Sequence, residues 1–152
     1  MNPHLSVYKH QQVHHEVQQA TPLKLVILLY DKAISLLRKG QLHLQRNELK
    51  AKGEALNRVI EIMSELQAVL NHQEGGEVAK NLDALYTFVI HSVTQANLYN
   101  KDAPIQSVLG VLEELRKGWK ELESMAEHQL GQSSLVVGNA GKQSLPFVRM
   151  NP

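Results

Sequence analysis

The sequence predicts an all-α protein: an antiparallel up-down four-helix bundle with an N-terminal helical arm and a flexible C-terminal tail. Four long segments repeat apolar residues in steps of three and four, which is the spacing of helices that pack on one another. Short links with helix start and stop signals separate these segments, and short links place consecutive helices antiparallel. The chain has 152 residues, of which 43% are hydrophobic, enough for one buried core.

The first long helix is expected to begin at Thr21. Threonine can accept hydrogen bonds from the free N–H groups of the next turn, and Pro22 fits the first helical position. The segment LKLVILLYDKAISLLRKGQLHLQRN then carries two apolar faces. One face holds Leu25, Leu29, Ala33, Leu36 and Leu44, and the other holds Ile27, Tyr30, Ile34 and Leu37. Two apolar faces predict two sets of neighbours.

The second and third helices are predicted from about Glu48 to Leu70 and from about Glu77 to Asn100. The second has a seam of Leu56, Val59, Met63, Leu66 and Leu70, and the glycines of HQEGG at 72–76 are expected to end it. The inner stripe of the third is predicted to consist of Val78, Leu82, Leu85, Val89, Val93 and Ala96. Tyr86, Ile90 and Asn97 are expected on an adjacent stripe.

The fourth helix is expected after KDAP, with Asp102 as its cap and Pro104 in its first turn. Its seam is Ile105, Val108, Leu112, Leu115, Trp119, Leu122 and Ala126. The periodicity stops near Gln129. We therefore divide the chain into a helical-bundle domain, 1–128, and a flexible tail, 129–152. Residues 1–20 are polar with widely spaced apolar side chains, which indicates a weak helix or a mobile arm.

The composition argues against several classes of function. Sixteen Lys and Arg against fifteen Asp and Glu give a net charge of +1, so no strong field would attract nucleic acid or an anionic membrane. There is no cysteine, hence no thiol nucleophile or thiolate metal site. We find neither a signal peptide nor an apolar run long enough to insert into a membrane. A cytoplasmic protein that is not an enzyme and needs no cofactor is expected.

Histidines offer one metal alternative. His10 and His14 are one helical turn apart with His15 beside them, a spacing that two ligands of one metal ion can have. No acidic ligand is fixed opposite them, and the simpler interpretation is a polar, solvated arm. We therefore predict no metal site.

The first helix has more apolar surface than a bundle helix needs. From Leu23 to Leu37 only Lys24, Asp31, Lys32 and Ser35 are polar, whereas about three positions in seven suffice to face a core. Either the N-terminal arm covers the second face, or this face and the Tyr86 stripe form a groove for another apolar helix. In such a groove Asn81 and Asn97 could pair with the backbone of the incoming chain.

At these residues the sequence resembles the flagellin export chaperone family. The resemblance covers about residues 1–128 and is carried by SVYKHQQV, TPLKLVILLYDKAI and AKGEALNRVIEIMSEL, then EGGEVAKNLDALYTFVIHSVTQANLYNKDAP and LEELRKGWKEL. Each piece alone is weakly specific, but their order and spacing together are distinctive.

The resemblance implies a cytoplasmic helical bundle that binds the disordered C-terminal segment of flagellin one to one. Such chaperones prevent premature polymerisation, deliver flagellin to the membrane protein of the export gate in the flagellar type III secretion system, and catalyse no reaction. Carried over residue by residue, the partner-binding positions are Leu5 and Tyr8 in the arm, Leu25, Leu29 and Tyr30 in the first helix, and Asn81, Leu82, Leu85, Tyr86, Ala96 and Asn97 in the third.

The sequence allows alternatives for the function and for the C-terminal tail. The alternative function is a helical adaptor that buries the same surface in a homodimer and has no flagellin client. The tail after His128 goes beyond the usual end of such chaperones, and it has three interpretations: disorder, an appended remnant, or an occupant of the groove through Leu135–Val137 or Leu145–Val148.

Overall fold

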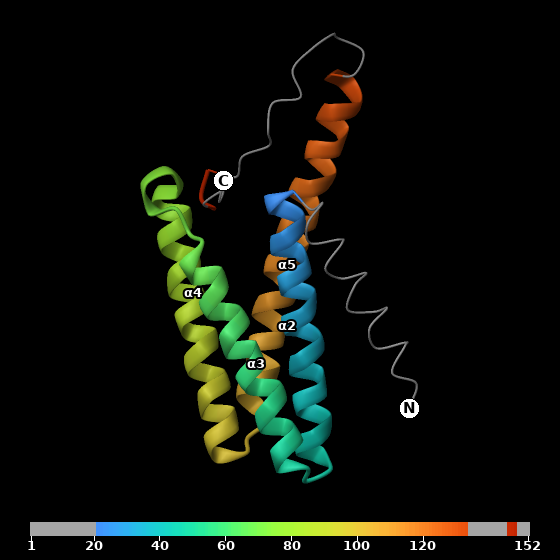
Figure 1. Cartoon of the computed structure of the whole chain (residues 1–152), viewed down its shortest axis with the longest axis vertical. Coiled ribbons are helices and arrows are strands. Elements are labelled where there is room, and N and C mark those ends of the chain that lie inside the picture. Colours follow the sequence, from blue (N-terminus) through green and yellow to red (C-terminus); the bar gives the residue numbers. More distant parts are fainter. Residues whose placement is uncertain (1–20, 134–145, 149–152) are drawn as a thin grey trace, which may run out of the picture.

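Four long helices form the bundle in the computed structural model, which describes residues 21–133 and 146–148. They are α2 (Pro22–Gln45), α3 (Leu49–Ala68), α4 (His72–Tyr99) and α5 (Ala103–Ser133). Consecutive helices run in opposite directions (Figure 1). α2 packs against α3 and α5, and α4 also packs against α3 and α5. The predicted all-α antiparallel bundle is confirmed, while the N-terminal arm, 1–20, lies outside the described residues.

α2 begins where the sequence predicted. The Thr21 hydroxyl accepts a hydrogen bond from the Lys24 N–H at 3.1 Å, and Pro22 opens the helix. Its buried residues are Leu23, Val26, Ile27, Tyr30, Ala33, Leu36, Leu37 and Gly40. Because α2 lies between α3 and α5, its two apolar faces have two neighbours within the bundle.

The boundary between α3 and α4 differs from the prediction. α3 ends at Ala68, before the glycines, and Asn71 then caps the next helix by accepting from the Glu74 N–H at 3.1 Å. HQEGG is therefore the first turn of α4 rather than the end of α3. Gly76 breaks the helix after this turn, with φ 50° and ψ −125°, a conformation that glycine adopts without the penalty of a Cβ atom.

The connection between α4 and α5 is fixed by polar contacts. Asn100 is in the left-handed conformation and ends α4. Lys52 of α3 is buried, and its ammonium donates to the Asn97 carbonyl at 2.9 Å and to the Asn100 side-chain oxygen. Asp102, predicted as a cap, accepts from the Gln41 amide at 2.9 Å. The bond to the Asn97 carbonyl satisfies a group that the helix end leaves free.

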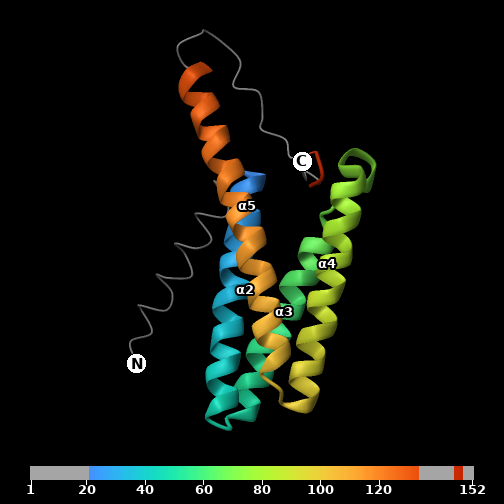
Figure 2. The same ribbon diagram turned by 180° about the vertical axis from the view of Figure 1, so that it is seen from behind.

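The bundle opens toward the end where α4 begins. In both views the start of α4 stands apart from α2 and α5 (Figures 1 and 2). Two residues predicted to lie inside are consequently exposed, Val78 to 52% and Leu122 to 40%. Both lie toward this open end, where the facing helix has moved away.

The C-terminal part of the chain returns to this open end. α5 continues past the predicted boundary at 128 to Ser133. Residues 146–148 lie against the bundle, with Val148 buried in the core cluster and Phe147 packed on it. The other tail cluster, Leu135–Val137, lies outside the described residues.

Candidate functional site

Two tyrosines meet at the centre of the bundle. Tyr30 of α2 and Tyr86 of α4 are 0% and 2% exposed, and their hydroxyl oxygens are 2.7 Å apart, so that one donates to the other. Their rings pack edge to face, with centroids 6.3 Å apart, and Tyr30 packs in the same way on Trp119. Each hydroxyl supplies the hydrogen bond that the other needs in an apolar interior. This pair is a polar contact within the core.

We expect the stability of the bundle to fall above about pH 10. Burial raises the pKa of both Tyr30 and Tyr86 above the usual value. Unfolded tyrosine loses its proton near pH 10, so the unfolded state binds fewer protons above this pH and stability is lost as pH rises. Each such group gives a slope of at most about 1.4 kcal/mol per pH unit, which is approached once the unfolded tyrosine has lost its proton. Urea unfolding from pH 8 to 11 measures it, and a Tyr30→Phe/Tyr86→Phe variant should lose this slope.

The structure separates the predicted partner-binding residues into several environments. Tyr30, Leu82, Tyr86 and Ala96 are buried, Leu25, Leu29, Leu85 and Asn97 are half-buried, and Asn81 is exposed. Leu5 and Tyr8 lie outside the described residues. α2 and α4 are diagonal in the ring of helices and meet through their tyrosines, so their predicted faces meet in the core instead of flanking a surface groove. Any partner contact by the buried residues stays a prediction.

Asn97 belongs to the interface of α4 with α3. Its amide approaches the Asn57 side-chain oxygen at 3.4 Å. On the same flank the Gln67 amide donates to Thr87 at 2.9 Å and to the Asp83 side chain at 3.2 Å. These contacts define the side of α4 that faces α3.

A different line of α4 residues runs along the flank next to α5. Its members follow one another in alternating steps of three and four: Val78, Asn81, Leu85, Phe88, Ser92, Gln95 and Tyr99. This spacing keeps side chains on one face of a helix. Phe88 is 45% exposed and Tyr99 60%, while Leu85 is half-buried. Exposed large apolar side chains in one line are typical of a binding surface.

α5 has a matching line on the flank that faces α4. Its other flank is tied to α2 by the ion pairs Arg116–Asp31, Arg38–Glu113 and Lys24–Glu123. The line away from these pairs holds Val111, Leu115, Leu122 and Met125, of which Met125 is 60% exposed. We call this line together with Val78, Leu85, Phe88 and Tyr99 the α4–α5 flank.

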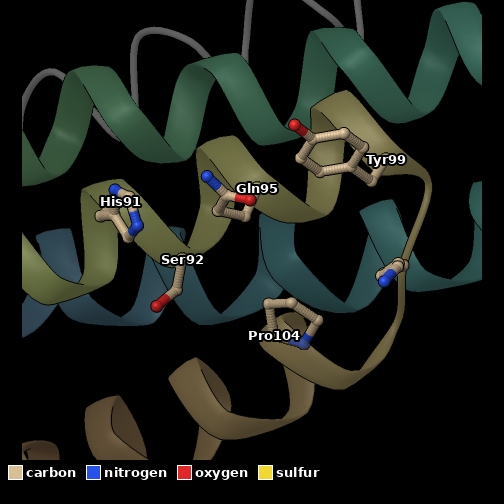
Figure 3. A pocket seen from close by; sticks show the side chains of 6 residues that line it. His91, Ser92, Gln95, Tyr99 and Pro104 are labelled. Atoms are coloured by element: carbon tan, nitrogen blue, oxygen red, sulfur yellow. The ribbon is translucent and has the colours of Figure 1, made fainter.

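A pocket lies at one end of this flank, where the two helices approach their connection. Ser92, Gln95 and Tyr99 of α4 line it together with Pro104 of α5, and its volume is about 540 Å³. Figure 3 shows His91, Gln95 and Tyr99 along α4 with Pro104 opposite. The ion pairs of α5 named above join it to α2, and α5 packs on α4 along this seam through apolar side chains.

The α4–α5 flank could have been found in the sequence only in part. Asn81 and Leu85 were among the predicted residues, but Val78 was assigned to the interior, and Phe88 and Tyr99 were not singled out. The alternating steps from residue 78 to 99 are present in the sequence. The sequence does not show that α5 leaves the side chains of this α4 line exposed.

Two further classes of site are absent from the described part of the chain. No group of three His, Asp or Glu side chains gathers there as a metal site, and His10, His14 and His15 fall outside it. Within residues 21–133, no helix combines the length and apolar character needed to cross a membrane. The apolar surface of the α4–α5 flank is thus the main candidate site that the described residues offer.

Comparisons with known proteins agree on one family. The sequence profile of the flagellar protein FliS matches residues 5–126. A flagellar secretion chaperone FliS from Salmonella typhimurium is 36% identical over 82% of this chain and 93% of its own length. The corresponding protein of Vibrio cholerae is 33% identical over 80% of this chain and 90% of its own length.

A solved structure supports the fold. The crystal structure of a bacterial flagellar chaperone superposes with a TM-score of 0.65, covering 76% of this chain and 98% of that one, at 22% sequence identity. The family is one of chaperones and not of enzymes. Since the profile spans most of the sequence and relatives above 30% identity cover most of it, this chain belongs to the family of the flagellar protein FliS.

Proposed function

We propose that this chain is a cytoplasmic export chaperone that binds the disordered C-terminal segment of flagellin on the α4–α5 flank. In this role it prevents premature polymerisation and delivers flagellin to the membrane protein of the flagellar export gate. The observation that carries the proposal is the line of exposed apolar side chains on α4, placed beside a matching line on α5. Its relatives are named flagellar secretion chaperones, which supports a secreted flagellar protein as the client.

The size of the surface is sufficient for a disordered client. Burying a large apolar side chain contributes about 1.5–3 kcal/mol, and ordering a disordered segment costs about 2–5 kcal/mol or more. The flank offers four apolar side chains on each helix. The free energy that a client helix gains by burying most of them exceeds the free-energy cost of ordering that helix. Asn81 and Gln95 provide hydrogen-bonding groups where the client backbone is not helical.

The other predicted contacts stay candidate positions with different roles. Leu25 and Leu29 are half-buried on α2, and we keep them as candidate positions for a second client segment. Leu5 and Tyr8 are candidates to cover the apolar surface before the client arrives. Among the buried residues, Tyr30, Leu82, Tyr86 and Ala96 would act by supporting the helices that carry the flank.

Calorimetric titration with a peptide of the flagellin C-terminal segment tests the proposal. We expect one peptide per chain and a Kd of about 1 µM or tighter, which corresponds to about −8 kcal/mol. The apolar flank should give a negative heat-capacity change. A flagellin peptide from the central region of the molecule is the control. Absence of heat and of any change in the Trp119 emission at millimolar peptide would refute the proposal.

A self-associating adaptor without a client is the second candidate function, because the same apolar flank can be buried by another copy of the chain. Light scattering separates the two. The chaperone should give the mass of a one-to-one complex when the flagellin peptide is added. A constant dimer mass with and without the peptide would favour the adaptor.

A further inference from the structure

Phe147, close to the C-terminus, lies at the open end of the bundle. Its ring packs on the indole of Trp119, with centroids 5.2 Å apart. On the opposite side it lies against the first turn of α4, so close that a Cβ atom built on Gly75 would be 2.5 Å from the Phe147 Cβ. Glycine at position 75 therefore leaves the space that this aromatic side chain uses.

The backbone next to Phe147 pairs with the link between α3 and α4. The Asn71 N–H donates to the Phe147 carbonyl at 2.7 Å. Leu70 and Val148 form an antiparallel bridge, and both are buried, at 3% and 8% exposure. Residues 146–148 thus bind through one backbone hydrogen bond, one bridge pair and the adjacent side chains of Phe147 and Val148, with Pro146 and Phe147 in a turn.

Only the tail side of this contact lies outside the part of the chain that the family shares. The family profile ends at residue 126, whereas the bundle side of the contact, from Leu70 to Trp119, lies inside it. The seat adjoins the α4–α5 flank, since Gly75 lies in the first turn of α4, just before the break at Gly76, and Trp119 lies between Leu115 and Leu122 on α5. A segment of the chain itself thus occupies the seat next to this end of the flank.

We propose that residues 146–148 are an intramolecular ligand that competes with the client for the α3–α4 end of the flank. This inference rests on the proposed function. The seat formed by Leu70, Asn71, Gly75 and Trp119 accepts an aromatic side chain followed directly by an aliphatic one. A client segment with this chemistry displaces the tail, and the tail closes the seat again when the client leaves.

The first test weakens the tail in the full chain. If residues 146–148 fill the seat nine-tenths of the time, they lower the apparent client affinity about tenfold. Phe147→Ala/Val148→Ala should therefore bind the flagellin C-terminal peptide about tenfold more tightly than the unchanged chain. Pro146→Ala is the matched control, because Pro146 is exposed, and its affinity should be unchanged.

The second test locks the tail in place. Residues paired across an antiparallel bridge have Cβ atoms about 4.5–5.5 Å apart, close to the range of disulfides, and the chain has no other cysteine. A Leu70→Cys/Val148→Cys variant should bind the peptide at least about tenfold more weakly when oxidised than when reduced. The reduced form of the same protein is the control for folding.

Trp119, the one tryptophan in the sequence, reports the exchange directly. Client binding should change its emission in the unchanged chain, and the Phe147→Ala/Val148→Ala variant should show an altered emission before client is added. Equal or weaker binding by this variant, or equal binding by oxidised and reduced Leu70→Cys/Val148→Cys, would refute the competition and leave the proposed function intact. Absence of peptide binding in every form would refute both.

Discussion

Replacing Tyr86 by alanine is expected to lower the free energy of unfolding by about 3–5 kcal/mol, the range for removing a buried aromatic side chain. Tyr86 is 2% exposed, packs edge to face on Tyr30 and shares its hydroxyl hydrogen bond. The substitution leaves a cavity and also an unpaired hydroxyl on Tyr30, whose desolvation is no longer compensated. For a bundle of this size such a loss is a large part of the total stability.

Phenylalanine substitutions separate the hydroxyl from the ring. Tyr86→Phe should cost about 1–3 kcal/mol, because the Tyr30 hydroxyl loses its partner. Adding Tyr30→Phe removes the unpaired group, so the double variant should lose less than the sum of the two single variants. Urea unfolding followed by circular dichroism measures all three. Additive losses would show that the two hydroxyls are not coupled.

Placing charges on the α4–α5 flank is expected to weaken client binding by about a hundredfold or more. Val78 and Phe88 are 52% and 45% exposed, so Val78→Asp/Phe88→Asp removes two apolar anchors without opening the core. Each anchor contributes about 1.5–3 kcal/mol, and each 1.4 kcal/mol changes Kd tenfold. Titration with the flagellin C-terminal peptide measures the loss.

Leu49→Asp is the matched control for these substitutions. Leu49 is 43% exposed, close to the value for Phe88, but it is the first residue of α3, where an acidic residue suits the helix dipole. Its Kd should equal that of the unchanged chain. If Leu49→Asp weakened binding as much as Val78→Asp/Phe88→Asp, or if the latter bound normally, the client would not use the α4–α5 flank.

The helices themselves were predictable because their signals are local. Thr21 and Pro22 set the start of α2, and apolar residues in steps of three and four identified each buried face. The glycine pair at 75 and 76 was interpreted wrongly, because a glycine after a helix is a common stop. The sequence contains a competing cap at Asn71, and this cap makes the same residues the start of α4.

The candidate site was predicted less well because its position depends on which helices are neighbours. Tyr30 and Tyr86 were expected to border a groove, but α2 and α4 lie diagonally and bury both tyrosines. α5 packs on a neighbouring face of α4. The face that carries Phe88 and Tyr99 is left exposed. A helical pattern identifies an apolar face without showing what packs on it.

For this protein the sequence alone determined the type and order of the four helices from Pro22 to Ser133, together with the family that the motifs resemble, since these follow from periodicity, caps and residue order along the chain. Only the tertiary structure decided that the tyrosines meet in the core, that α4 diverges from α5, and that Phe147 returns to Trp119. Such contacts join residues far apart in sequence, and their geometry depends on the packing of the whole bundle.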